Sequence, residues 1–400
     1  MEEIIPLKIL ILADGRSPIT RRWIAMLKPL GFHITLISSY ACDPVPGADN
    51  FYILPLAFSQ FGGSQAGSGG SSGLRNLVKR VRPLAQKIRH WLGPWTIEFK
   101  KNTLQQIIAA EKPNILHAMR IPFEGMLAGY VDSKIPLIIS TWGNDFTLHA
   151  PSTMRMGALT RRALARASAL ISDTQVDAQR AAEWGFATGK PILVVPGNGG
   201  IDLAEMQEAC KGVIKSEPFR VINPRGLRSY VRSDTFFKAI PLVLKEIPDV
   251  QFSCTSMKDQ PEAENWVRSL GIETNVNLLP LLTQEEVWRE FARSQISVSP
   301  STHDGTPNTL LEAMALGCLP ICGDLPSIRE WITPGENGLL IDPGEPYALA
   351  DAILQALRSP ALISSAASAN RLILNDQANI EQVRQKVLKL FQEIIEAKSK

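Results

Sequence analysis

The sequence predicts an α/β protein built from two tandem, doubly wound domains. Its 400 residues are 45% hydrophobic and 20% charged, a composition typical of a globular protein with room for two cores. Short apolar runs of the kind found in buried parallel strands recur along the chain, and patterns of helical period separate them. This alternation indicates βαβ units and a parallel sheet in each half.

The first half opens with an apolar run, a loop that contains Gly15, a helical pattern over about 19–30 and a second run. Together these make one βαβ unit, and similar units follow. The runs predicted as strands are 8–12, 33–38, 114–117, 136–140, 169–172 and 191–195. We expect this domain to cover residues 1–205.

A second series of runs begins at residue 219 and indicates a domain over 206–378. Its predicted strands are 219–222, 250–254, 276–279, 296–298, 319–322 and 338–341. A helical pattern at about 380–397 comes after the last of them, so we expect residues 379–400 to form a separate terminal helix.

The strongest functional signal follows the run at 296–298. Asp304 begins a loop with a glycine and a proline, and a helical pattern starts near Asn308. The free N–H groups and the dipole at the start of a helix favour phosphate. The carboxylates that flank the loop, Asp304 and Glu312, suit sugar hydroxyls instead, because they accept hydrogen bonds from them. The combination predicts a nucleotide-sugar site.

The same segment resembles the donor-site signature of retaining glycosyltransferases of family 4. It shares the acidic-x7-Glu spacing of Asp304 and Glu312, the glycine after the first acid, and the Glu-Ala-Met-Ala-x-Gly run that ends at Gly317. The first acid is usually glutamate in that family. The resemblance implies that Asp304 faces the donor sugar and that Glu312 holds the ribose. The loop residues that it assigns to the donor are Gly305, Thr306, Pro307, Asn308 and Thr309.

The resemblance also implies a fold and a set of cations. Family members have the GT-B fold, in which two Rossmann-like domains enclose a cleft and a terminal helix crosses back to the first domain. They stabilise the departing diphosphate with an arginine and a lysine after the first strand of the second domain. The matching stretch here has arginines in a shuffled order and no lysine. We expect Asp304, Arg225 and Arg232 to act in catalysis and Arg228 to bind the donor, with solvated loop charges as the alternative for the arginines. Since cations and a helix start serve this purpose, we expect no metal and no cofactor.

Residues at the predicted strand ends of the first domain are candidates for the remaining contacts. Gly15 lies in the first strand–helix turn, where the backbone can approach the donor. His117, Asp145 and Asn198 follow later strands, at the edge where α/β sheets place ligands, and are predicted on the acceptor side. For His117 the alternative is a hydrogen-bonded core residue. Trp142 stands where many family members have a histidine.

An insert at about 60–97 departs from this pattern. Ten of the twelve residues in 62–73 are Gly or Ser, and apolar positions at helical spacing follow over 74–95. This part of the chain lacks acidic residues and carries Arg75, Lys79, Arg80, Arg82, Lys87 and Arg89. Two interpretations stay open: an interfacial helix that binds an anionic membrane surface, and an amphipathic pair that packs on the first domain.

The sequence therefore predicts a metal-independent, retaining glycosyltransferase of the hexosyltransferase type. Its expected partners are a nucleotide sugar and an acceptor saccharide, with a lipid-linked or envelope polysaccharide intermediate as the finer expectation, and no nucleic acid. No apolar run has transmembrane length and the N-terminus lacks a signal-peptide pattern, which favours a cytoplasmic protein, peripheral on the inner face of the membrane if the insert binds lipid. The alternatives are a nucleotide-sugar epimerase or hydrolase of the same fold and a catalytically silent nucleotide-sugar-binding scaffold.

Overall fold

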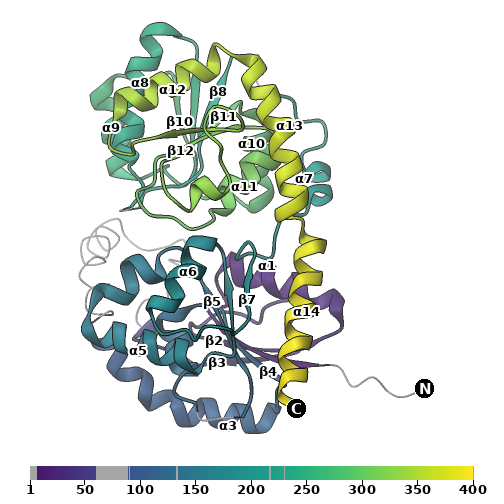
Figure 1. The fold of residues 1–400 in the computed structure, drawn as a ribbon. Helices are drawn as coiled ribbons and strands as arrows, with labels where there is room; N and C mark the ends of the chain where they lie inside the picture. The colour runs from purple at the N-terminus through teal and green to yellow at the C-terminus, as the bar shows by residue number, and fades with distance from the viewer. Residues whose placement is uncertain are drawn as a thin grey trace. The chain divides into compact units, whose positions relative to one another are not determined.

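The computed structural model describes residues 7–59, 89, 91–131, 134–215, 218–228 and 230–399. The chain divides into two compact units, the first formed by Met1–Gly199 with Val383–Lys400 and the second by Gly200–Gln382. Each unit contains one parallel sheet flanked by helices (Figure 1). The prediction of two doubly wound α/β domains is confirmed.

The first unit contains a seven-stranded sheet of order β3-β2-β1-β4-β5-β6-β7. Its strands are β1 Lys8–Ala13, β2 His33–Ser38, β3 Asn50–Ile53, β4 Ile115–Ala118, β5 Leu137–Thr141, β6 Ala169–Ser172 and β7 Ile192–Val194. The apolar run of β1 is buried on both faces, as expected of a central parallel strand. The prediction missed β3, because this four-residue edge strand is only partly buried and shows no apolar run.

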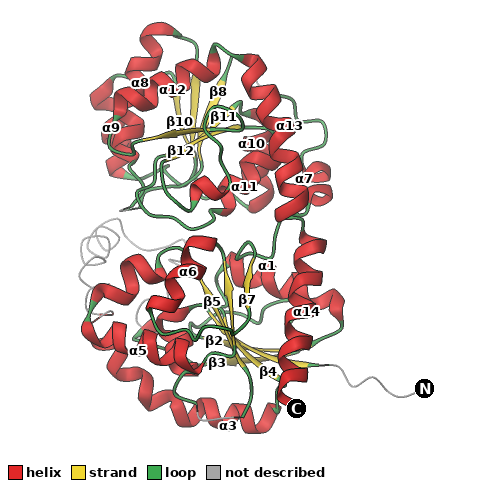
Figure 2. Ribbon diagram, viewed as in Figure 1, coloured by secondary structure: helices red, strands yellow, loops and turns green. Residues whose placement is uncertain are grey.

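Helices and short helical turns connect these strands (Figure 2). They are α1 Pro18–Leu27, η1 Lys28–Leu30, η3 Glu98–Lys100, α3 Lys101–Glu111, η4 Ile121–Gly125, α4 Met126–Ala128, η5 Asp145–His149, η6 Ala150–Ser152, α5 Met154–Arg166 and α6 Gln175–Glu183. The terminal helix α14 Ile380–Ser399 belongs to this unit from Val383 onward, and its Phe391 and Val387 are fully buried.

The second unit contains a six-stranded parallel sheet of order β10-β9-β8-β11-β12-β13. Its strands are β8 Arg220–Asn223, β9 Gln251–Cys254, β10 Val276–Leu278, β11 Ile296–Ser299, β12 Leu319–Gly323 and β13 Leu339–Ile341. The connections are α7 Leu203–Ala209, α8 Ser233–Glu246, α9 Pro261–Leu270, α10 Gln284–Arg293, α11 Asn308–Ala315, η7 Ile328–Glu330, α12 Pro346–Leu357 and α13 Pro360–Gln377.

Both sheets reverse their strand order beside the first strand of the unit. The reversal lies between β1 and β4 in the first sheet and between β8 and β11 in the second. Loops that leave the carboxyl ends of two such strands run in opposite directions, and α/β proteins bind ligands in the space that this leaves. We call these two places the first and the second switch point.

Candidate donor site at the second switch point

The second switch point is bridged by an ion pair. Arg225 follows β8 and Asp304 follows β11, and Nη2 of Arg225 donates to Oδ2 of Asp304 at 2.7 Å. The two side chains are 8% and 14% exposed, so the pair is largely shielded from water. An Asx turn fixes the start of the arginine loop, in which the N–H of Arg225 donates to Oδ1 of Asn223 at 3.1 Å.

One nitrogen of the Arg225 guanidinium, Nε, stays without a hydrogen-bond partner among the described residues. Nη1 of Arg225 donates to Oγ1 of Thr309 at 3.2 Å, whereas Nε is buried and has no hydrogen-bond partner among the described residues. Buried donors are nearly always paired in folded proteins, and one left unpaired costs about 1–3 kcal/mol. A guanidinium held in this way has an N–H group available for an anionic ligand.

Burial and charge act on Asp304 in opposite directions. Burial raises the pKa of Asp304, and the charges of Arg225 and Arg228 lower it. Its own backbone oxygen accepts a hydrogen bond from Ser327 at 2.7 Å, which ties the loop to the segment after β12. The carboxylate therefore orients Arg225 inside a rigid loop.

The loop after Asp304 leads directly into helix α11. Pro307 precedes the helix with extended backbone angles, and no side chain caps its first turn. Thr306 is fixed by the indole of Trp331, whose Nε1 donates to its Oγ1 at 2.9 Å. The structure thus brings Asn308 and Thr309, at the uncapped start of α11, to the same switch point as Arg225. Free backbone N–H groups and an arginine together favour a phosphate.

Glu312 lies further along α11 and is 5% exposed. Its Oε1 accepts a hydrogen bond of 2.9 Å from Nε2 of Gln284, the first residue of α10. A capping box formed by Thr283 and Glu286 fixes where α10 begins and so holds Gln284 in place. The amide orients the carboxylate without neutralising it, which leaves Glu312 able to accept hydrogen bonds from hydroxyl groups.

The other two predicted arginines occupy a shallower position. Arg228 is exposed and donates to the Tyr230 hydroxyl at 2.9 Å, and its charge lowers the pKa of Asp304. Arg232 forms two bonds of 2.8 Å with Asp234, and this side-chain pairing is the main reason that the pKa of Asp234 falls to about 2. Both arginines line a pocket of about 380 Å³, but only Arg225 pairs with Asp304.

The other predicted site residues, Gly15, His117, Asp145 and Asn198, belong to the first unit. Gly15 is buried, its N–H donates to Oγ of Ser38 at 3.1 Å, and its carbonyl accepts from Arg21 at 3.0 Å. A Cβ at this position would meet Sγ of Cys42 at 2.8 Å. Crowding against β2 is therefore sufficient reason for this glycine, and its N–H is already engaged.

The prediction that His117 contacts an acceptor conflicts with its burial, because the side chain is 0% exposed. Its Nε2 hydrogen-bonds Oγ of Ser140 at 2.8 Å, and its ring packs edge-on against Trp23 and Phe391. Burial lowers the pKa of His117 to about 3, so the imidazole is neutral. The alternative interpretation of this histidine, a hydrogen-bonded core residue, fits the structure.

Asp145 and Asn198 are also buried, at 0% and 2% exposed. Asp145 pairs with Nε of Arg120 at 3.0 Å and accepts the backbone N–H of Trp142 at 3.2 Å. Burial raises its pKa, and the charge of Arg120 lowers it. Asn198 lies in a tight turn that Gly199 closes with a φ of 89°. Both residues therefore shape loops at the sheet edge rather than present free side chains there.

Sequence reasoning missed two residues of the candidate site and one contact of a third. Gln284, Thr309 as an arginine partner, and Trp331 all act through contacts between segments that lie far apart in the chain. The pattern Thr-x-x-Glu at 283–286 was the one readable signal, since it marks a helix start at Gln284. Within the described residues no group of three or more His, Cys, Asp and Glu side chains could hold a metal ion, and metal-free transfer stays a prediction.

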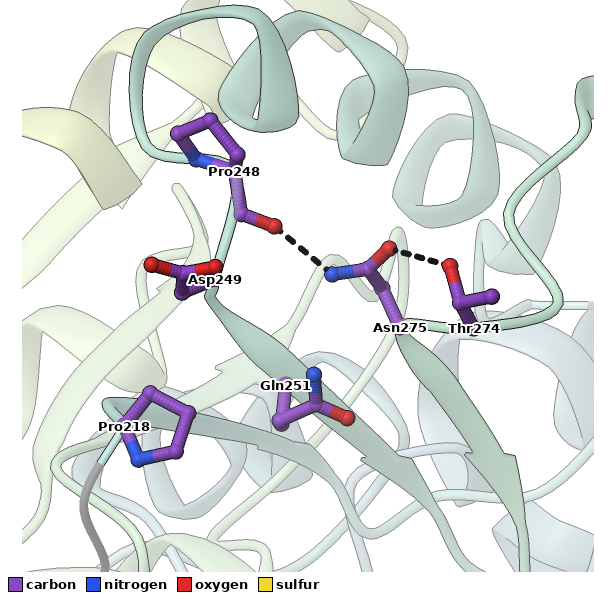
Figure 3. A pocket seen from close by; sticks show the side chains of 6 residues that line it. All are labelled: Pro218, Pro248, Asp249, Gln251, Thr274 and Asn275. Carbon is purple, nitrogen blue, oxygen red and sulfur yellow. Dashed lines mark hydrogen bonds between the residues drawn. The ribbon is translucent and has the colours of Figure 1, made fainter.

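A separate pocket of about 490 Å³ opens at the opposite edge of the second sheet (Figure 3). It lies at the amino ends of β8, β9 and β10, where Asn275 donates to the carbonyl of Pro248 at 2.8 Å and accepts from Thr274 at 2.9 Å. Its polar groups pair with one another across the loops. These bonds fix the loops, and the pocket lies away from the carboxyl edge that α/β sheets use for ligands.

Two family profiles match this chain. The profile described as Glycosyl transferase 4-like matches residues 8–174. The one described as Glycosyl transferases group 1 matches residues 226–359, which include Asp304, helix α11 and Glu312 and begin directly after Arg225. Both profiles describe glycosyl transferases. The chain is a glycosyltransferase.

Similar solved structures have the same architecture as this glycosyltransferase. Sucrose-phosphate synthase from Thermosynechococcus elongatus matches with a TM-score of 0.71 and 15% identity over 98% of this chain and 100% of that chain. Anabaena HepE in complex with UDP-glucose matches with a TM-score of 0.69 and 15% identity over 97% and 100%. At these identities the likeness shows the fold alone, and it confirms the predicted GT-B fold.

Two curated relatives match shorter stretches. An exopolysaccharide phosphotransferase of Streptomyces coelicolor is 29% identical over 165 residues, which are 36% of this chain and 17% of the relative. An O-antigen chain mannosyltransferase B of Escherichia coli is 33% identical over 95 residues, which are 24% of this chain and 22% of the relative. The matched part is thus about a fifth of the length of each relative.

Proposed function

We propose that this chain transfers a sugar from a nucleotide-sugar donor to a saccharide acceptor and that the second switch point holds the donor. The observation that carries the proposal is the Arg225–Asp304 pair beside the uncapped start of α11, with Nε of Arg225 buried and unpaired among the described residues. An arginine fixed by a carboxylate and a free helix start supply donors of the kind that a diphosphate accepts.

Each remaining donor contact follows from the same geometry. A diphosphate at Arg225 and the first turn of α11 leaves Glu312, one turn further along the helix, for the ribose hydroxyls. Breaking the bond between the sugar carbon and the phosphate oxygen leaves negative charge on the diphosphate, which the guanidinium stabilises. We assign Arg225 and Asp304 to this task, Arg228 to the exposed rim, and Arg232 to its pair with Asp234.

Retention of the anomeric configuration and independence from metal ions are further parts of the proposal. Retention is supported by the acidic-x7-Glu signature that the chain shares with retaining family 4 enzymes. Metal independence is supported by the arginines, because fixed positive charge at the leaving group does the work that a bound cation does in other transferases.

The acceptor is proposed to be a saccharide of a surface or secreted polysaccharide, carried on a lipid. The names of the two curated relatives, one of an exopolysaccharide enzyme and one of an O-antigen enzyme, support this class. The segment predicted to reach the membrane lies mostly outside the described residues, in 60–88 and 90. Its described end carries Trp91 and Trp95, which are 70% and 59% exposed; Phe99, just after the insert, is 83% exposed. In the described part of the chain, every helix is too short or too polar to cross a bilayer.

Membrane contact has its own test, since the exposed aromatic side chains suit an interface. Cosedimentation with liposomes should increase with anionic lipid and decrease with salt, because surface charge is screened over about 8 Å at physiological ionic strength. Trp91→Gln with Trp95→Gln should weaken binding while the protein stays folded. If the unchanged protein ignores liposomes of every composition, the lipid-borne acceptor loses this support.

A thermal-shift screen of nucleotide sugars tests the proposed activity most economically. A ligand at about 100 times its Kd stabilises the folded state by roughly 2.7 kcal/mol, which raises the melting temperature by several degrees. The donor found in this way should be consumed only when an acceptor is added. Consumption without an acceptor would indicate the hydrolase or epimerase alternative, and no shift with any nucleotide sugar would contradict the proposal.

A further inference from the structure

Three arginines gather at the first switch point, in a place that the donor site does not use. Arg16 follows β1, Arg120 follows β4, and Arg89 precedes the helical residues 91–97. Arg16 and Arg89 stack on one ring: their guanidinium carbons lie 3.5 Å and 4.9 Å from the ring centre of Tyr40, which follows β2. Segments that are far apart in the chain thus bring positive charge to one point of the sheet edge.

Aromatic rings also support the other faces of these cations. Arg89 lies 4.6 Å from the ring centre of Phe123, and Arg120 lies 5.2 Å from that of Trp142. Phe123 adopts a φ of 67°, a left-handed conformation that is costly for a bulky residue and is found mostly at functional sites. The N–H groups of a guanidinium lie in its own plane and point outward from its edge. An aromatic ring that covers the face of the guanidinium therefore leaves these edge N–H groups in a position to bind an oxyanion.

Two buried donors in this cluster have no partner. They are Nε of Arg89 and Nε1 of Trp142, which are both shielded from water and make no hydrogen bond to any described residue. Buried N–H groups without a partner are rare, because each costs about 1–3 kcal/mol. Nε1 of Trp142 lies on the edge of the ring next to Gly197, so a ligand at the arginine cluster that accepts a hydrogen bond would satisfy Nε of Arg89.

The charges around the arginines leave Arg89 least compensated. Arg16 pairs with Asp14 and Arg120 with Asp145, each at 3.0 Å. Arg89 makes no such ion pair among the described residues; the charges of Glu124 and Asp14 stabilise its cation, and those of Arg120 and Arg16 oppose it.

The acid that faces Arg89 is Glu124. It is 5% exposed and accepts a hydrogen bond from Ser39; burial raises its pKa, and the charges of Arg89 and Arg120 lower it. Because Nε of Arg89 has no partner among the described residues, the cluster can still bind an added anion. A phosphate ester carries about −1.5 to −2 charges and three acceptor oxygens, against one charge and two oxygens for a carboxylate.

We propose that Arg16, Arg89 and Arg120 form an anion site that binds a phosphate ester of the acceptor substrate. The proposal rests on the proposed function, because it assumes that the first unit takes the acceptor. A soluble sugar phosphate and a lipid-linked sugar diphosphate share this chemistry, and the experiment below separates them. Arg16 and Arg120 are each 31% exposed, and each already donates to a carboxylate, Asp14 and Asp145.

The indole of Trp142 is a direct reporter of the site. In the full chain labelled with ¹⁵N-tryptophan, the Trp142 signal is identified from its loss in Trp142→Phe, and inorganic pyrophosphate is then titrated in. We expect this signal to shift in the unchanged protein and in Arg225→Gln, which removes phosphate binding at the second switch point. Arg89→Gln should weaken the response at least tenfold.

Arg161→Gln is the matched control, because Arg161 also stacks on a tryptophan of the first unit, Trp184 at 4.7 Å, but lies outside the cluster. It should leave the Trp142 response unchanged. Circular dichroism of each variant checks that it is folded. Arg89→Lys keeps the positive charge but loses the bidentate guanidinium, so pyrophosphate should still shift the Trp142 signal, although more weakly. A Trp142 signal that ignores pyrophosphate in the unchanged protein overturns the proposal.

Kinetics then assigns the anion to the acceptor. Once a donor is known, Arg89→Gln should raise KM for a phosphorylated acceptor about 10- to 100-fold, and donor binding should stay the same. A sugar 1-phosphate and a sugar diphosphate on a lipid in detergent micelles are compared as acceptors, and use of either one supports the site. Equal loss with phosphorylated and dephosphorylated acceptors overturns the assignment. If no nucleotide sugar is turned over although pyrophosphate still shifts Trp142, the proposed function fails and the anion site remains.

Discussion

The two switch points have the same topology but differ in how their arginines are held. In the second unit a carboxylate holds the arginine: Asp304 fixes Arg225, and a helix start lies beside them. In the first unit aromatic rings stack on the arginines; Arg16 and Arg120 also pair with carboxylates, whereas Arg89 has no ion pair among the described residues. Both leave an arginine Nε without a partner among the described residues. Topology thus decides where a ligand binds, and the residues that hold the arginine decide how rigid and how strongly charged the site is.

The largest expected effect comes from breaking the ion pair of the second switch point. Asp304→Ala leaves the guanidinium of Arg225 buried without its counterion, and loss of one partner of such a pair costs about 3–5 kcal/mol. Urea unfolding measures this loss, and turnover of the donor should disappear as well.

The double variant Asp304→Leu with Arg225→Met separates stability from function. Apolar residues of similar size in place of both charges should restore most of the stability but none of the turnover. If Asp304→Ala costs less than about 1 kcal/mol, the pair behaves like an exposed one and the contrast between the two switch points fails.

The next effect concerns Glu312 on α11 of the second unit. Glu312→Ala removes a charge-assisted hydrogen bond of about 1.5–3 kcal/mol, so kcat/KM for the donor should fall about 10- to 100-fold or more. Gln284→Ala should cause a smaller decrease, because it only releases the carboxylate. Glu285→Ala, an exposed acid on the same helix as Gln284, is the control and should change nothing. Unchanged kinetics in a folded Glu312→Ala would remove this residue from the donor site.

Because His117 is buried in the core behind the first switch point, the free energy of unfolding should depend on pH. His117 has a folded pKa of about 3, below the value of about 6.5 in the unfolded chain, so only the unfolded state binds this proton between the two. Its contribution to stability is complete above about pH 6.5 and is lost as the pH falls toward 3, by about 1.4 kcal/mol per pH unit. His117→Gln should flatten the curve by that slope.

Ser140→Ala is the control for this measurement. It removes the hydrogen-bond partner of Nε2 but keeps the titrating imidazole, so the protein should lose some stability and keep the slope. If His117→Gln and the unchanged protein have parallel curves from about pH 4 to 6, the histidine is not a buried neutral residue.

The smallest expected effect is that of chelation. With arginines and a helix start to stabilise the leaving group, transfer in excess EDTA should proceed at the same rate as without it. If EDTA abolishes turnover and Mg²⁺ or Mn²⁺ restores it, the arginines and the helix start are not sufficient to stabilise the leaving group.

Local patterns in the sequence were sufficient for the fold and for one loop of the site. The apolar runs gave every strand except β3, and the Asp304-to-Glu312 spacing was visible because both acids belong to one loop and helix. The Arg225–Asp304 pair joins residues that are 79 positions apart, and no pattern within one segment indicates it.

Residues at strand ends were harder to interpret. His117 lies on a central parallel strand, where both faces are covered, so a polar residue near the strand end can point into the core as well as out of it. Arg89 was counted among the charges of a surface insert, yet it stacks on Tyr40 and Phe123. Only the fold brings it beside Arg16 and Arg120.

The central claim is that a nucleotide sugar binds at the second switch point, and hydrogen exchange of the full chain tests it most directly. Saturating donor should slow exchange of the backbone amides at 225–228 and at the start of α11, because the ligand covers both. The same donor added to Glu312→Ala at equal concentration should protect them less. Turnover of the donor without any change of exchange at either segment would contradict this account.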